Sequence, residues 1–296
     1  MWVVAALAGP VYASGVSASW GWRWALVVYL PVLIAARAVM AGQIHDLRLD
    51  EETDHDETVP WLPALAMAAG VALIGALRAS SPWFWPGVGV GAGLVLWSCS
   101  YVLPDGTLRL VPGRRAGIAT LLWVCAFFLT LDYLVAPSAH DVLGLTPTQT
   151  GWALTAGGIG WSAVAIACGA RPAREPQAYR RRTMLATVFF VVGTMLMVVT
   201  VLEKADWWGL PVGYGVASIG MGLTHLDTMN RIVTDPAEPD GITHAQAATA
   251  VTIAGAAGGA VLGTAATAFV APTASGVEAA RLWPTLALLA GGLLLT

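Results

Sequence analysis

The feature that most constrains this chain is a repeated pattern of apolar runs, most of them close to 20 residues long, separated by short polar stretches. The hydrocarbon core of a bilayer is about 30 Å thick, and an apolar helix of roughly 20 residues crosses it. An open sheet would leave backbone groups unsatisfied in lipid, so the runs predict helices. The fold class is therefore an all-α integral membrane protein, a polytopic bundle of about ten transmembrane helices. The predicted segments are 2–17, 22–41, 61–77, 84–103, 116–136, 150–170, 183–202, 210–229, 245–270 and 282–296.

The charge content supports the same class. Charged residues make up 11% of the chain and hydrophobic residues 57%, whereas roughly a quarter of the residues of a soluble domain are charged. The formal net charge of -3 argues against nucleic acid as a partner, because phosphates call for a basic face. The three cysteines lie in apolar runs without the paired spacing of a zinc site or a redox motif, and we interpret them as small buried side chains.

The distribution of basic residues predicts the orientation. If the first segment runs outward from the cytoplasm, 11 basic residues fall on the inner side and 4 on the outer side, as the positive-inside rule requires. Tryptophans cluster near the outer turns, where amphipathic rings anchor at the headgroups. A multi-pass protein of the plasma membrane with cytoplasmic termini is therefore expected.

Both ends of the chain suggest a piece of a longer protein. A signal peptide would explain the apolar beginning, but no Lys or Arg precedes the run. The last segment has only 15 residues, about 22 Å of helix. A complete ten-helix transporter of another superfamily is the alternative, although no five-plus-five internal repeat is visible.

The opening stretch carries a resemblance. "AGPVYASGVSASWGWRWALVVYLP" is similar to the end of the fifth helix and the start of the sixth in fourteen-helix drug:proton antiporters of the major facilitator superfamily, of the actinobacterial type. Gly9 and Pro10 match the core of the antiporter motif, Arg23 and Trp24 match its external turn, and Pro31 matches a helix break. The chain departs from the motif at Ala13 and Ser14, where the family usually has glycines; these residues are still small enough for close helix contact.

Later stretches resemble the same superfamily. They include "AFFLTLDYLVAPSAHDVLGLTPTQTGWALTAGGIGWSAVAIACGARP" and "GMGLTHLDTMNRIVTDPAEPDGITHAQAATAVTIAGAAGGAVLGTA". The resemblance implies a partial major facilitator fold that starts at the fifth helix. It divides the chain into the last two helices of an N-terminal bundle (1–41), an acidic cytoplasmic linker (42–60), two extra central helices (61–103) and a C-terminal six-helix bundle whose last helix is truncated (104–296).

The resemblance implies a secondary active transporter that exports small amphipathic compounds in exchange for protons by alternating access. It implies no cofactor, with the proton gradient as the energy source, and a monomer in the lipid bilayer. An ordinary kink at Pro10 is the alternative interpretation of the Gly-Pro pair, but the matching external turn favours the antiporter motif. A non-transporting or degenerate scaffold is the alternative function. No constellation of catalytic residues or metal ligands predicts an enzyme. Since alternating access needs two bundles, the chain alone is not expected to transport.

Ionisable residues within the apolar runs are the candidates for proton coupling, because charge in hydrocarbon is costly. Asp132 lies in "FFLTLDYLV" and is the first candidate, with an acid at the outer headgroups as the alternative. His225 and Asp227 are the others. They lie two residues apart and do not share a helix face, whereas Asp227 and Arg231 are four apart. We therefore favour an Asp227–Arg231 salt bridge over a proton relay.

Two further groups complete the predictions. Trp123, Trp152, Trp161 and Tyr214 are candidates for a substrate cavity, with core or lipid-facing positions as the alternative. The acidic loop "HDLRLDEETDHDETVP" lacks the order of a metal site and is interpreted as a solvated linker. The loop "RPAREPQAYRRR" fixes the topology and is a candidate for contact with anionic lipid.

Overall fold

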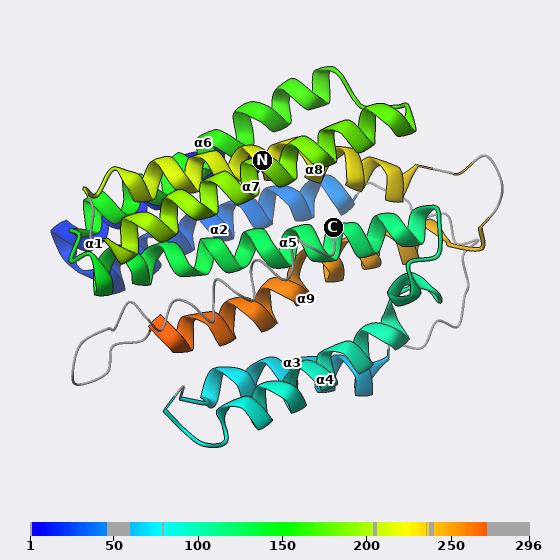
Figure 1. Cartoon of the computed structure of the whole chain (residues 1–296), viewed down its shortest axis with the longest axis horizontal. Helices are drawn as coiled ribbons and strands as arrows, with labels where there is room; N and C mark the ends of the chain where they lie inside the picture. Colours follow the sequence, from blue (N-terminus) through cyan, green and yellow to red (C-terminus); the bar gives the residue numbers. More distant parts are fainter. Residues whose placement is uncertain are drawn as a thin grey trace.

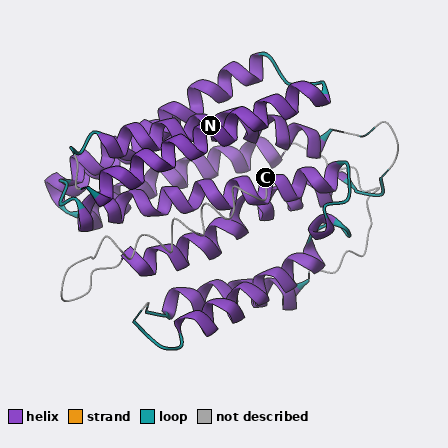
Figure 2. Cartoon of the chain, viewed as in Figure 1, coloured by secondary structure: helices purple, strands orange, loops and turns teal. Residues whose placement is uncertain are grey.

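The structure is a computed structural model that describes residues 2–45, 60–78, 80–203, 206–234, 236 and 240–270. Within these residues the chain consists of helices joined by loops and turns and has no strand (Figure 2). Nine α-helices correspond to the first nine predicted segments, and the tenth, 282–296, lies outside the described residues. The helices are α1 (Trp2–Trp20), α2 (Trp22–His45), α3 (Trp61–Ala76), α4 (Phe84–Val102), α5 (Arg114–Pro137), α6 (Pro147–Ala170), α7 (Pro176–Leu202), α8 (Gly209–Val233) and α9 (His244–Val270), with a 3-10 turn η1 (Thr107–Arg109) and a π-helix η2 (Ser138–Val142).

Five of the described helices are long and apolar enough to cross a membrane. The prediction of ten spans goes further than this and stays a prediction. α3 is apolar but shorter, and α8 does not belong to the five. α8 contains His225 and Asp227, but it packs against α5, α6 and α7, and these two polar side chains are partly buried and buried between the helices. The spans are Trp22–Gly42, Arg114–Val142, Pro147–Ala170, Pro176–Leu202 and His244–Thr267.

The core of the molecule is built around α8. This helix packs against α5, α6 and α7, while α9 packs along α5 and α1 along α6 (Figure 1). Small residues allow the close approach: a side chain at Gly160 would collide with the backbone of Gly215, and one at Gly193 with the backbone of Ala217. Such contacts between small residues are how membrane helices gain van der Waals packing. α6 and α7 therefore pack closely against α8, which brings their polar residues near those of α8.

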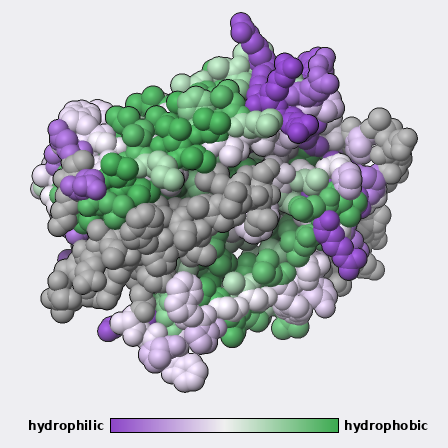
Figure 3. Space-filling model, viewed as in Figure 1, coloured by the Kyte–Doolittle hydropathy of each residue, from purple (hydrophilic) through white to green (hydrophobic). Residues whose placement is uncertain are grey.

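Consecutive helices from α5 to α9 run in opposite directions, so the arginines that flank them gather at one end. Arg114 begins α5, Arg171 follows α6, Arg182 lies near the start of α7 and Arg231 near the end of α8. We call this the basic end; it lies at the right in Figure 1. The opposite end carries η2 and the connection between α7 and α8. Exposed side chains along the helices are largely apolar between the two ends, as the green surface in Figure 3 illustrates.

Two helical hairpins flank this core. α3 and α4 pack closely at Gly70 and Gly91, and α3 also contacts α9 (Figure 1). α1 and α2 contact each other, but the membrane-spanning part of α2 has no buried residue. The predicted helix break at Pro31 is wrong, because α2 continues through this residue. Proline is tolerated where a membrane helix can satisfy the freed carbonyl in other ways. The acidic residues between 46 and 59 lie outside the described residues.

Candidate functional site

The carboxyl group of Asp132 meets a buried tyrosine between α5 and α8. The hydroxyl of Tyr214 donates a hydrogen bond of 2.6 Å to Oδ1 of Asp132. Tyr214 is 3% exposed, and Asp132 is partly buried. Within the described residues, no Arg, Lys or His forms an ion pair with Asp132. The partner of this carboxylate inside the apolar bundle is therefore a hydroxyl donor and not a cation. Among these residues, no counter-charge holds the carboxyl group in its ionised form.

Aromatic rings extend this pair across three helices. Phe128 of α5 stacks on Tyr214 with ring centroids 5.7 Å apart, and its edge meets Trp161 of α6 at 5.5 Å. Trp161 in turn meets His225 of α8 edge to face at 5.3 Å. We call these five residues the Asp132 cluster. Four of them, Asp132, Tyr214, Trp161 and His225, are residues that the sequence singled out separately.

Local sequence explains why the cluster forms. Phe128 precedes Asp132 by one helical turn, so both lie on the same face of α5, and both lie within the span Arg114–Val142. On α6, the ring of Tyr214 occupies the space that a side chain at Gly157 would fill. Only glycine at this position allows the tyrosine to reach α5 beside α6. The cluster therefore depends on one small residue in "TAGGIG" as much as on its polar members.

This arrangement is chemically suited to the gain and loss of a proton at Asp132. An ionised Asp132 accepts the hydrogen bond from Tyr214, and a protonated Asp132 still offers oxygen lone pairs to the same hydroxyl. The rings of Phe128 and Trp161, which extend the cluster from Tyr214, carry no charge. Asp132 can therefore change charge while its partner stays in place. Because Tyr214 lies on α8, this change in charge alters the contact between α5 and α8.

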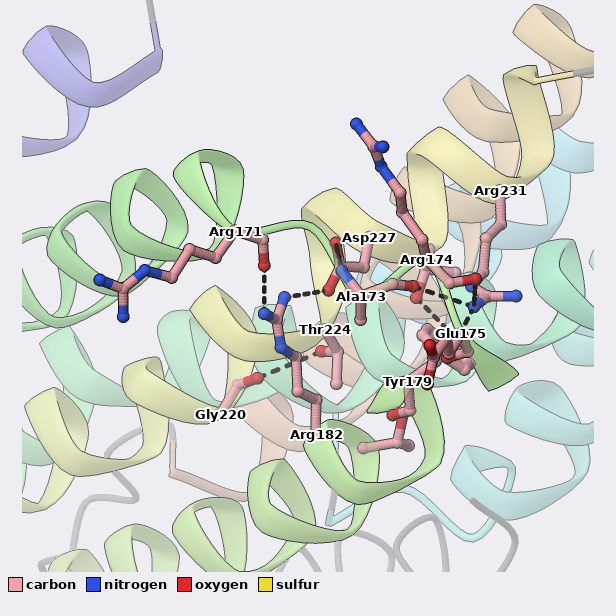
Figure 4. A network of polar contacts seen from close by, with 12 residues as sticks. Arg171, Ala173, Arg174, Glu175, Tyr179, Arg182, Gly220, Thr224, Asp227 and Arg231 are labelled. Carbon is pink, nitrogen blue, oxygen red and sulfur yellow. Dashed lines mark hydrogen bonds and ion pairs between the residues drawn. The ribbon is translucent and has the colours of Figure 1, made fainter. Parts of the chain in front are cut away.

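Asp227 has a different role from Asp132. It is 4% exposed and accepts a hydrogen bond of 2.6 Å from Nη1 of Arg182, and its other oxygen lies 3.3 Å from the backbone nitrogen of Ala173 (Figure 4). The predicted pair with Arg231 is wrong. The α6–α7 connection and the first turns of α7 lie against the end of α8, where Ala173 of the connection and Arg182 of α7 bind the carboxylate in place of Arg231. A buried charge with a matched counter-charge is a structural ion pair.

Arg231 instead holds the backbone of the same connection. Its Nη2 donates to the carbonyl oxygens of Ala173, Arg174 and Glu175 at 3.0, 3.4 and 3.5 Å, and its guanidinium lies over the ring of Tyr179. Nη2 of Arg182 also donates to the carbonyl oxygen of Arg171. We call the contacts of Arg182, Asp227 and Arg231 the Asp227 clamp (Figure 4). The clamp fixes the α6–α7 connection onto α8 at the basic end.

The antiporter-motif residues lie apart from the cluster, on the face between α1 and α6. A side chain at Gly151 of α6 would collide with the hydroxyl of Ser14 and the carbonyl of Pro10, so the two helices touch at the predicted motif. Gly9 has no such neighbour within the described residues, and Ala13 is exposed. In the predicted external turn, the guanidinium of Arg23 lies 5.1 Å from the centroid of the Trp22 ring. Trp24 is exposed.

The remaining cavity candidates do not join the Asp132 cluster. Trp123 packs partly buried against the core, and Trp152 is 52% exposed on α6. A pocket does lie at the basic end beneath α4, but its lining comes from other residues, Cys99, Ser100 and 103–109. All three cysteines are free and buried, as the sequence predicts. No group of residues that could hold a metal ion occurs in the described part of the chain.

Sequence reasoning missed three residues that hold these sites together. Phe128 could have been found from its spacing of one turn before Asp132. Arg182 is one of three consecutive arginines, and nothing in the sequence distinguishes it from the other two as the partner of a buried acid. Asp240 pairs with Arg114, which is 126 residues away in the chain, and no local signal predicts that contact.

No protein-family model, curated protein or solved structure matches the chain. The resemblance to the major facilitator superfamily therefore stays a prediction, and the functional argument has to come from the geometry of the site.

Proposed function

We propose that the chain is the membrane-embedded part of a proton-coupled secondary transporter of the major facilitator type, which exports small amphipathic compounds by alternating access. The observation that carries this proposal is the Asp132–Tyr214 hydrogen bond inside the bundle, on a carboxylate without a cationic partner among the described residues. Ionisable groups in this position inside a membrane bundle commonly mark proton or ion pathways.

The position of Asp132 supports coupling. It lies about 27 Å along α5 from Arg114, at 1.5 Å per residue, and therefore closer to the end opposite the basic end. In the proposed orientation the basic end faces the cytoplasm. Protons would then reach Asp132 from the outside, which is the side from which an exporter takes them up.

The surrounding helices support movement. The Asp132 cluster joins α5, α6 and α8, so a change in charge at Asp132 acts on the contacts between three helices at once. Small residues line the contacts of α8 with α6 and α7, at Gly160 and Gly193. Helices that meet through small residues can shift against one another without displacing large side chains, which rocking of a bundle requires.

The test is efflux driven by a pH gradient. The protein is expressed from its complete open reading frame in cells that lack efflux pumps, and export of ethidium, a small amphipathic cation, is measured with and without the gradient. Asp132→Asn is expected to abolish gradient-driven export. Tyr214→Phe removes one hydrogen bond to a charged group and is expected to reduce export about tenfold. Asp141→Asn, an exposed acid just beyond the same helix, is the matched control and should not change export.

The outcomes separate the proposals. Gradient-driven export that survives Asp132→Asn would exclude Asp132 as the coupling residue. The scaffold alternative would be favoured if a correctly inserted wild-type protein exports no ethidium. It would also require that a pH-sensitive dye trapped inside the cells reports no acidification when other amphipathic cations are added.

A further inference from the structure

The connection between α6 and α7, together with the first turns of α7, presents a cluster of exposed arginines at the basic end. Arg171, Arg174, Arg180 and Arg181 are exposed, and none of them forms an ion pair among the described residues. Glu175 is the one acidic residue in this stretch, and Arg182 is neutralised by Asp227. The four arginines and the glutamate leave a formal excess of three positive charges over about ten residues.

The Asp227 clamp keeps these side chains available. Arg182 and Arg231 bind the backbone carbonyls of Arg171, Ala173 and Arg174, which fixes the connection against α8. The guanidinium groups of Arg171 and Arg174 project away from the network (Figure 4). The clamp therefore fixes the backbone that carries Arg171 and Arg174, and α7 carries Arg180 and Arg181 beside it.

Directly beside the arginines, the exposed face of α7 becomes apolar. Met184 lies one turn after Arg180, and Leu185 one turn after Arg181, so each pair shares a helix face. Met184, Leu185 and Val188 are 60%, 48% and 56% exposed. Figure 3 shows hydrophilic atoms at the basic end next to hydrophobic surface. This change within one turn matches the boundary between headgroups and acyl chains.

We propose that this surface binds an anionic phospholipid, whose headgroup phosphate is held by the arginines and whose acyl chain lies along Met184, Leu185 and Val188. A guanidinium binds phosphate oxygens with two parallel hydrogen bonds, and several arginines next to a membrane surface favour anionic over zwitterionic lipid. The apolar face favours a lipid over a free anion, since an inorganic phosphate has no acyl chain to contact these apolar side chains. The inference is independent of proton coupling.

The experiment is a titration of the purified full chain with phosphatidylglycerol or phosphatidylcholine in detergent, with bound lipids counted by native mass spectrometry. Wild type should bind phosphatidylglycerol more tightly than phosphatidylcholine. Arg180→Gln with Arg181→Gln should raise the Kd for phosphatidylglycerol about 25-fold at low salt, about fivefold for each arginine. The matched control, Arg37→Gln with Arg78→Gln, removes the same charge from exposed positions elsewhere and should change the Kd less than twofold.

Three results would overturn the inference. They are equal affinity of wild type for the two lipids, an equal loss of affinity in the control variant, and displacement of phosphatidylglycerol by inorganic phosphate at a similar concentration. Thermal unfolding of each variant in the same detergent establishes that it is folded. Met184→Ala with Leu185→Ala provides a second check, because it should weaken binding of phosphatidylglycerol while leaving every arginine in place.

Discussion

Asp132 and Asp227 show how the environment of a residue divides similar side chains between two roles. Both are acids within helices of the same bundle. Among the described residues, Asp227 is matched by the charge of Arg182 at 2.6 Å, whereas Asp132 has a hydrogen bond from the hydroxyl of Tyr214 and no cationic partner. A paired charge stabilises one arrangement, and an acid without a counter-charge can change its protonation state. The difference gives Asp227 a structural role and supports the proposal that Asp132 exchanges protons.

Replacement of Asp227 is therefore expected to destabilise the protein. Asp227→Asn leaves Arg182 without its counter-charge and should lower the free energy of unfolding by about 3 kcal/mol, at the lower end of the range for buried pairs because Arg182 is 23% exposed. Thermal unfolding in detergent measures the loss. Asp141→Asn, which changes an exposed acid, should stay within about 0.5 kcal/mol of wild type.

The double variant Asp227→Asn with Arg182→Met separates the pair from the fold. With both charges removed, part of the lost stability should return, since no charge remains buried without its partner. A double variant less stable than Asp227→Asn alone would show that Arg182 acts mainly through the carbonyl oxygen of Arg171.

At the scale of elements, the contacts of α8 depend on glycines that face it from both sides. A side chain at Gly193 of α7 would collide with the backbone of Gly213 and Ala217, which cannot move away without separating the helices. Gly89 of α4 has nothing within 4 Å of the same position. The two glycines therefore make opposite predictions for the same substitution.

Gly193→Ala is expected to lower the free energy of unfolding by about 2 kcal/mol, because overpacking forces the two helices apart. Gly89→Ala should leave stability unchanged or raise it by up to about 1 kcal/mol, the gain in helix propensity. Unfolding in detergent compares the two variants under identical conditions. Equal effects of the two substitutions would show that α7 and α8 do not meet as closely as the structure places them.

At the scale of the whole molecule, the basic end is tied together by a second arginine network. Arg114 donates to the carboxylate of Asp240 and, at 2.7 Å, to the carbonyl oxygen of Ile242. Arg115 donates to the carbonyl oxygens of Asp105 and Asp240. These bonds join three parts of the chain, the α4–α5 connection, the start of α5 and the α8–α9 connection. They connect the α3–α4 hairpin to the core.

This network predicts a dependence of stability on pH. The hydrogen bonds from Arg114 and Ile242, together with the charges of Arg114 and Arg115, hold the pKa of Asp240 well below its ordinary value, which is about 3.9. The ionised form is favoured in the folded state, so the stabilisation is present above that ordinary pKa and is lost as the pH falls below it.

The comparison of wild type with Asp240→Asn isolates this effect from other carboxylates. The difference in unfolding temperature between the two proteins should stay constant from pH 7 to about pH 5 and shrink as the pH falls below about 4. A difference that does not change over the whole range would show that the charge of Asp240 contributes nothing to the tie.

The sequence by itself determined the helices and their apolar character, because both follow from runs of residues that are local in the chain. It also located most members of the Asp132 cluster, since a charge or a polar ring inside an apolar run is visible without a structure. The partners of these residues were not predictable. Tyr214 lies 82 residues from Asp132, Arg182 45 residues from Asp227, and Asp240 126 residues from Arg114. Only the tertiary packing of the helices decided which of these distant residues contact each other. The pairing of Asp227 with Arg231, which helical spacing favours, does not form, because Arg182 near the start of α7 binds Asp227 and the backbone carbonyls of the α6–α7 connection bind Arg231.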